Sequence, residues 1–271
     1  MYPQEHIHPS ELAEVIDHLK GSDPLEVIGT GNHRSVQRIG ETNFVLKTPF
    51  LSVPYSRSWV VVLEALSQCA CIMYQVSQQL GFSVVPYTQY IMPDSSIAQR
   101  LQESCLHLKH PMLLQRYITP AKVPLDLQHA HRVVIFNWLI GKPDPKYENS
   151  ILDMQGKVWE IDNELGGKRL DVKPGQKGLF SNWTPHWLFM RPEVQVPLCP
   201  SLIQHVRALP ENIKLDQKLF PEHFQSSLVT SIEQVVTSNL KFLKRALLSL
   251  RGESVTLEKL KTNVDQQLEK A

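Results

Sequence analysis

The feature that most constrains the fold of this chain is a change in residue pattern between Leu25 and Leu80. Residues 25–49 contain short apolar segments separated by the turn-forming sequences Gly29-Thr-Gly31 and Gly40-Glu-Thr-Asn43. This pattern is typical of three antiparallel strands joined in a meander. Residues 57–80 contain no glycine or proline, and their length allows about six helical turns before Gly81. The sequence therefore predicts a small β-rich lobe followed by a long helix.

The rest of the chain shows the same two periodicities. Helices are predicted at 9–20 behind a Ser10 cap, from an Asp126 cap to Ile140 with a stop at Gly141 and Pro143, beyond Pro221, and at 254–268. Strands are predicted at 84–91, 112–118, 150–152 and 157–161, the last two joined by Asp153-Met-Gln-Gly156. This order predicts an α+β chain of 271 residues in two lobes. We expect an N-terminal helix in 1–24, a small lobe in 25–118, a mainly helical lobe in 119–252, and a charged peripheral helix in 253–271.

Charge and cysteine content exclude several classes of function. Lys plus Arg number 28 and Asp plus Glu number 27, so the formal charge of +1 creates no global attraction to nucleic acid. No apolar run approaches the ~18 to 20 residues of a membrane-spanning helix. The four cysteines and the absence of an apolar leader are not typical of a secreted, disulfide-bonded protein. We therefore expect a cytoplasmic protein without a transmembrane segment.

A glycine-containing loop between the first two predicted strands is a candidate anion site. In Gly29-x-Gly31-x-x-x-Ser35, the glycines allow backbone N–H groups to approach phosphate oxygens closely. The alternative is an ordinary hairpin turn. A Walker loop is excluded, because no Gly-Lys-Ser/Thr follows and the next element is a strand.

Two charged residues fit a phosphate site as a pair. Lys47 stands among apolar residues in Phe-Val-Leu-Lys-Thr, and its ammonium would need a partner if it were buried. Glu64, on the long helix, is the only acidic residue between Thr42 and Pro93. Each alone is compatible with a surface charge. Together they fit a strand lysine that is held by a helix glutamate and reaches nucleotide phosphates.

The most specific pattern lies between Gly141 and Glu164. Asp144 and Asn149 have the Asp-x4-Asn spacing of a catalytic loop, in which the aspartate orients the attacking hydroxyl and the asparagine holds a metal. Asp162, at the end of the following hairpin, would supply a second metal ligand. Mg2+ prefers hard oxygen ligands and takes few of them from protein. The alternative is that Asp144 and Asn149 only cap a turn.

This series of residues resembles the protein kinase superfamily, and its details are similar to the phosphatidylinositol 3/4-kinase branch, especially type II phosphatidylinositol 4-kinases. The similar segments are Leu113-Leu-Gln-Arg-Tyr-Ile118, Ile161-Asp-Asn163 and Asn182-Trp-Thr-Pro-His-Trp187. The resemblance covers Leu25 to Val196 and implies a bilobal protein-kinase-like fold with ATP and Mg2+ or Mn2+ as cofactors. It implies phosphate binding by Lys47, partnered by Glu64. It also implies nucleotide contacts from the residues Gly29, Gly31, Ser35, Gln115 and Tyr117.

The same resemblance implies Asp144 and Lys47 as the catalytic residues and Asn149 with Asp162 as metal ligands. Two positions depart from the family: Pro145 stands where these lipid kinases commonly have arginine, and Glu164 replaces a glycine. The Cys-Cys-Pro-Cys-Cys motif that can be palmitoylated is absent.

The predicted acceptor site is a basic segment after Asp162. Between Gly166 and Lys177 the only acidic residue is Asp171, and the cations are Lys168, Arg169, Lys173 and Lys177. Such a loop suits an inositol headgroup or an anionic membrane surface. The alternatives are a solvated loop or one that binds an acidic protein substrate.

We therefore expect an ATP-dependent kinase that phosphorylates a phosphoinositide, with phosphatidylinositol as the expected substrate. It would work in the cytoplasm, peripherally at membranes. The alternatives are a protein kinase on the same scaffold, including a bacterial effector acting on proteins in a host cytoplasm, and a pseudokinase that binds a partner.

Overall fold

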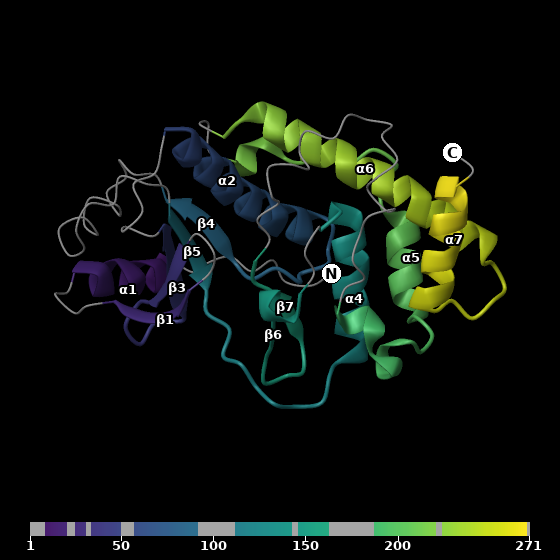
Figure 1. Cartoon of the computed structure of the whole chain (residues 1–271), viewed down its shortest axis with the longest axis horizontal. Coiled ribbons are helices and arrows are strands. Elements are labelled where there is room, and N and C mark those ends of the chain that lie inside the picture. The colour runs from purple at the N-terminus through teal and green to yellow at the C-terminus, as the bar shows by residue number, and fades with distance from the viewer. Residues whose placement is uncertain are drawn as a thin grey trace.

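The computed structural model describes most of the chain and shows an α+β protein, with a sheet at one end and helices at the other (Figure 1). The described residues are 9–20, 25–30, 34–49, 57–91, 112–142, 146–162, 187–220 and 224–269.

The helices are α1 (Pro9–Lys20), α2 (Arg57–Gln79), α4 (Leu127–Ile140), α5 (Pro200–Ala208), α6 (Ser226–Ser249) and α7 (Leu257–Glu269). The strands are β1 (Glu26–Thr30), β2 (Arg34–Arg38), β3 (Phe44–Pro49), β4 (Thr88–Ile91), β5 (Met112–Arg116), β6 (Ser150–Leu152) and β7 (Val158–Glu160). Short 3-10 helices occupy η1 (Tyr147–Asn149), η2 (Trp187–Met190), η3 (Pro192–Val194) and η4 (Gln217–Leu219).

The five strands β1 to β5 form one antiparallel sheet in the order β1-β2-β3-β5-β4. The predicted meander is confirmed, and Gly40 takes the positive φ of 50° that the β2–β3 turn requires. Side chains alternate between the two faces of a strand, so successive residues of β3 contact different parts of the molecule. Phe44 and Leu46 pack with Val15 of α1 in a small core. Val45 and Lys47 point to the other face, toward the rest of the molecule.

The larger core lies between that inner face of the sheet and the helices. It contains Tyr90 and Leu113 from the sheet, together with buried side chains of α2, α4, α6 and α7. The most buried helix is α4, in which every residue from His129 to Ile140 except Arg132 is buried. Asp126 caps this helix by accepting from the N–H groups of residues 128 and 129, and Gly141 ends it in the left-handed conformation. The sequence predicted both caps.

Two element boundaries and the burial of the last helix differ from the sequence-based expectations. The helix α1 begins at Pro9, so Ser10 lies inside it and not at its cap; proline is favoured at the first helical position because it lacks an N–H. The strand β4 begins only at Thr88, and not at residue 84. The last helix is not peripheral, because Leu257, Leu260 and Val264 are buried in the larger core.

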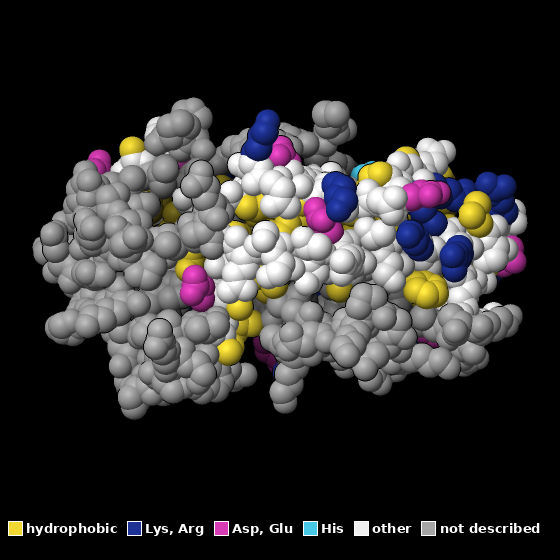
Figure 2. Space-filling model, turned by 90° about the horizontal axis from the view of Figure 1, so that it is seen from above, with side chains coloured by type: hydrophobic (Ala, Val, Ile, Leu, Met, Phe, Trp, Pro, Cys, Tyr) yellow, Lys and Arg dark blue, Asp and Glu magenta, His cyan; other side chains and the backbone are white. Residues whose placement is uncertain are grey.

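Seen from the α6 side, Lys and Arg side chains gather toward the end of the molecule that carries α7 and the C-terminal part of α6 (Figure 2). Lys241 and Arg245 of α6 are exposed there, at the opposite end from the sheet. None of the helices, within the residues described, combines the length and apolarity needed to cross a membrane.

A tight backbone contact fixes the β6–β7 hairpin against the segment before α4. Gly156 has φ +79°, and a Cβ at this position would lie 2.4 Å from the carbonyl oxygen of Pro124. The Asp126 N–H also donates to the Gly156 carbonyl over 2.8 Å. The turn of the hairpin therefore has no room for a side chain at position 156.

We predict that Gly156→Ala lowers the free energy of unfolding by on the order of 2 kcal/mol or more, through backbone strain and the clash. Gly252→Ala is the matched control, because Gly252 has φ +85° with nothing within 4 Å of its Cβ position. Urea denaturation of both variants measures the difference. Equal losses would show that the contact with Pro124 does not constrain the hairpin.

A buried histidine joins α4 to β7 and makes stability depend on pH. His129 Nδ1 accepts from the Val158 N–H over 3.2 Å. Burial lowers the His129 pKa from 6.5 to about 4, because the charged imidazolium would be desolvated. Below pH 6.5 the unfolded chain thus binds a proton that the folded chain does not, and stability falls as pH falls from about 6.5 toward 4.

We predict that His129→Asn, whose amide oxygen can replace Nδ1 as acceptor, removes this loss. Between pH 7.5 and pH 5 the wild-type free energy of unfolding should fall by about 2 kcal/mol more than that of the variant. Urea denaturation at the two pH values tests it. Parallel pH profiles would contradict the burial of a neutral imidazole.

Candidate functional site

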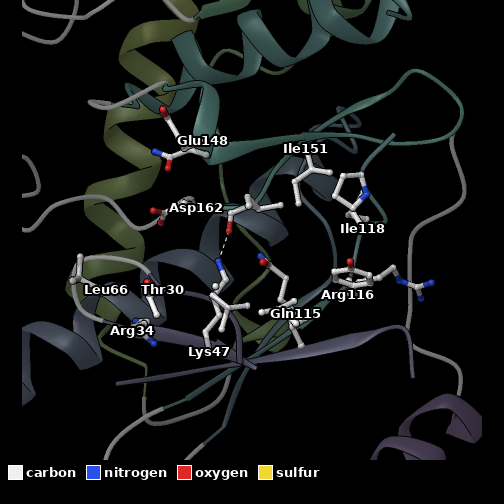
Figure 3. A pocket seen from close by; sticks show the side chains of 18 residues that line it. Thr30, Arg34, Lys47, Leu66, Gln115, Arg116, Ile118, Glu148, Ile151 and Asp162 are labelled. Carbon is white, nitrogen blue, oxygen red and sulfur yellow. Dashed lines mark hydrogen bonds between the residues drawn. The ribbon is translucent and has the colours of Figure 1, made fainter. Parts of the chain in front are cut away.

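A cavity of about 620 Å³ lies between the inner face of the sheet and the β6–β7 hairpin, and Figure 3 shows the side chains that line it. Six of the residues that we expected to act together are among those lining it: Gly29, Lys47, Gln115, Tyr117, Asn149 and Asp162. The cavity thus brings together parts of the chain that are more than a hundred residues apart.

Lys47 joins the sheet to the opposite wall of the cavity. The strand pleat directs its side chain inward, where the residue is only 9% exposed. Its Nζ donates a hydrogen bond to the carbonyl oxygen of Ile161 (Figure 3). The Ile161 N–H in turn donates to the carbonyl oxygen of Asn149 over 3.0 Å. The ammonium is therefore hydrogen-bonded to the residue before Asp162, and that residue is hydrogen-bonded to the Asn149 backbone.

The wall of the cavity opposite the sheet carries side chains with oxygen atoms that could bind a metal ion. Asn149 ends η1, Asp162 follows β7, and Glu148 also lines the cavity, as Figure 3 shows. Across the described residues, no three His, Cys, Asp or Glu side chains cluster in a way that could hold a metal ion. One amide oxygen and one carboxylate fit a Mg2+ ion that takes its other ligands from phosphate and water.

Arg34 is a cation of the cavity that the sequence did not reveal. It is 5% exposed, and its Nη2 donates to the Leu63 carbonyl oxygen over 3.1 Å and to Ser67 Oγ over 2.6 Å, both on α2. Val36 pairs with Lys47 in the sheet, so Arg34, two residues before it on the same face, is a diagonal neighbour of Lys47. The sequence did contain one signal: Arg34 stands two residues before Val36, so the two side chains share one face of the strand.

Apolar residues also line the cavity, and Val36 and Val45 do so from the sheet. At the end away from Asp162, Figure 3 shows Ile118 beside Ile151 of the hairpin. The chain from Arg116 to Ile118 borders this end. The Arg116 guanidinium turns to the outer face of the sheet, 5.6 Å over the Phe44 ring and 3.5 Å from Glu11.

Two expected residues do not join the others in the cavity. Ser35 points to the outer face, because neighbouring strand residues alternate, and its hydroxyl lies 2.8 Å from Thr48 Oγ1. Its side chain therefore does not line the cavity, and its contact with a nucleotide stays a prediction. Glu64 accepts from Gln68 Nε2, one turn along its own helix, over 3.4 Å. Its pairing with Lys47 stays a prediction.

Six further predicted site residues lie outside the described part of the chain, and their roles stay predictions. They are Gly31, Asp144, Lys168, Arg169, Lys173 and Lys177.

No protein-family model matches this sequence, and no curated protein matches it either. Function is therefore inferred from the chemistry of the cavity and from the residue pattern.

Lys47 and Arg34, the two cations described above, predict that the cavity binds a chain of phosphates. We expect tripolyphosphate to bind, and Lys47→Met and Arg34→Met each to weaken it about tenfold, or about 1.4 kcal/mol. Isothermal titration calorimetry measures the affinity. Lys241→Met and Arg245→Met, exposed on α6, are the matched controls and should bind as the wild type does. Equal affinity in all variants would place anion binding elsewhere.

Proposed function

We propose that this protein is an ATP- and Mg2+-dependent phosphotransferase whose nucleotide lies in the cavity between the sheet and the β6–β7 hairpin. The observation that carries the proposal is that Lys47, Asn149 and Asp162 line one cavity, and that Ile118 and Ile151 line it at the end away from Asp162 (Figure 3). A nucleotide has the same division, with charged phosphates at one end and a flat, weakly polar base at the other. A volume of about 620 Å³ is within the range of small-molecule sites.

The apolar end suits the adenine ring. Val36 and Val45 would contact one face of the ring and Ile151 the other. The N–H groups of Arg116 and Tyr117 already donate to the carbonyl oxygens of Tyr87 and Asn43, over 2.9 and 2.7 Å. We therefore expect the next N–H, that of Ile118, to donate to the adenine ring.

The polar end suits the phosphates. Lys47 would exchange its bond to the Ile161 carbonyl for phosphate oxygens, and Arg34 would add a second positive charge from β2. Asn149 and Asp162 would hold Mg2+, which when bound neutralises the phosphate charge that develops during transfer. Asp144 would orient the acceptor hydroxyl and receive its proton as the γ-phosphoryl group is transferred.

Arg34 makes the phosphate loop differ from that of protein kinases. In their Gly-x-Gly-x-x-Gly-x-Val pattern, Arg34 occupies the position of the third glycine, and Val36 that of the valine. The guanidinium ties this position to α2 through Leu63 and Ser67. We expect the start of β2 to move less than it would with glycine at this position.

We predict that Asp162→Asn lowers turnover at least about 100-fold, because it removes the charged metal ligand. Nucleotide affinity measured in EDTA should stay near that of the wild type, whereas the gain in affinity from added Mg2+ should be lost. Fluorescent-nucleotide binding and ATP turnover measure the two effects. Asp265→Asn on α7 is the control. Unchanged turnover in Asp162→Asn would contradict its role as a ligand.

The acceptor that we propose is the inositol headgroup of phosphatidylinositol, supported by the basic segment from Lys168 to Lys177 and by the resemblance to lipid kinases. A protein hydroxyl is the second candidate. Radiolabelled ATP with phosphatidylinositol vesicles, and separately with candidate proteins, distinguishes them. Label in the lipid supports the proposal. Label only in protein overturns the lipid acceptor, and nucleotide binding without transfer supports a pseudokinase.

A further inference from the structure

A buried ion pair lies directly behind the candidate metal site. The Lys142 ammonium donates to Glu160 Oε2, and their side chains are 4% and 0% exposed. The other carboxylate oxygen of Glu160 accepts from Ser150 Oγ over 2.7 Å. The indole N–H of Trp187 donates to that same hydroxyl over 3.0 Å. The carboxylate and the Ser150 hydroxyl together therefore join four segments of the chain.

The members of this network are sequence neighbours of the proposed active-site residues. Lys142 stands two residues before Asp144, Ser150 follows Asn149 directly, and Glu160 stands two residues before Asp162. The Ile161 N–H also donates to the Asn149 carbonyl oxygen, so the residues directly before Asp162 and Ser150 are bonded to each other as well. Glu160 is thus bonded to the two segments that carry the asparagine and the catalytic loop, and it belongs to the strand that leads to Asp162.

The energetics of buried charges argue that the pair does more than stabilise the fold. Desolvation of two charges offsets most of their attraction, and replacing both with uncharged groups of similar size is often neutral or stabilising. Hydrogen-bonded ions do, however, fix distances more strictly than apolar packing, because each oxygen must meet its donor.

We propose that Glu160 is a positioning residue, which through its bonds to Lys142 and Ser150 sets the spacing of Asn149 and Asp162 for binding metal-nucleotide. This inference rests on the proposed phosphotransfer function. It predicts that loss of the charges leaves the cavity and its affinity for free nucleotide in place but weakens the metal-dependent part of binding and turnover.

The test is the double variant Lys142→Met/Glu160→Gln, which removes both charges and keeps the size of each side chain. We expect a stable fold and metal-free nucleotide affinity near that of the wild type. The apparent KM for Mg2+ should rise and kcat should fall, each about tenfold or more, since small displacements of reacting groups have effects of this size or larger. Steady-state kinetics and nucleotide binding with and without EDTA measure these quantities.

The control is Lys214→Met/Glu233→Gln, which removes another pair whose carboxylate is buried, with 7% of its side chain exposed. It should leave the KM for Mg2+ unchanged. If the first double variant does not fold, Ser150→Ala replaces it, because this change removes the hydroxyl that bonds to both Glu160 Oε1 and the Trp187 indole while the ion pair remains. It should move the KM for Mg2+ in the same direction.

The outcomes separate the two proposals. Wild-type protein that binds no nucleotide overturns the phosphotransfer proposal and this inference together. Wild-type protein that binds nucleotide more tightly with Mg2+, beside a folded variant with the same KM for Mg2+ and the same kcat, overturns only the positioning role of Glu160.

Discussion

The alternation of side chains along β3 is the constraint on which the cavity depends. Phe44 and Leu46 bury one face of this strand against α1, and Val45 and Lys47 serve the other. Because the side-chain period of a strand is two, a slip of one residue would place the ammonium in the small core and an apolar side chain in the cavity. The cores on both sides of the sheet therefore fix the position of the cation.

The second constraint is the unit formed by η1 and the β6–β7 hairpin, which faces the sheet across the cavity. Its parts are held by backbone contacts at Gly156 and Asn149 and by the buried Glu160 carboxylate. Lys47 reaches this unit through the Ile161 carbonyl oxygen. The cavity therefore has one wall set by sheet packing and one set by hydrogen bonds, and the Lys47 side chain connects them.

The sequence was sufficient for features that depend on local chemistry. It predicted the meander, the Gly/Pro-free helix α2, the caps of α4 and the Asp153–Gly156 turn, since these arise from neighbouring residues. It did not reveal Arg34 or the Lys142–Glu160 pair, because a cation on a strand or after a helix is common until its partners are known. The burial of α7 was missed for a related reason: most of its residues are charged or polar, and a narrow stripe of Leu257, Leu260 and Val264 enters the core.

The most direct test of the account is to label the protein with an acyl phosphate of ATP, which transfers its acyl group to an amine near the phosphates and releases ATP. We expect Lys47 to be the main acylated residue by mass spectrometry of peptides, and excess ATP with Mg2+ to suppress the reaction. Acylation that ATP suppresses at another lysine, with Lys47 unmodified, would contradict a nucleotide site in this cavity.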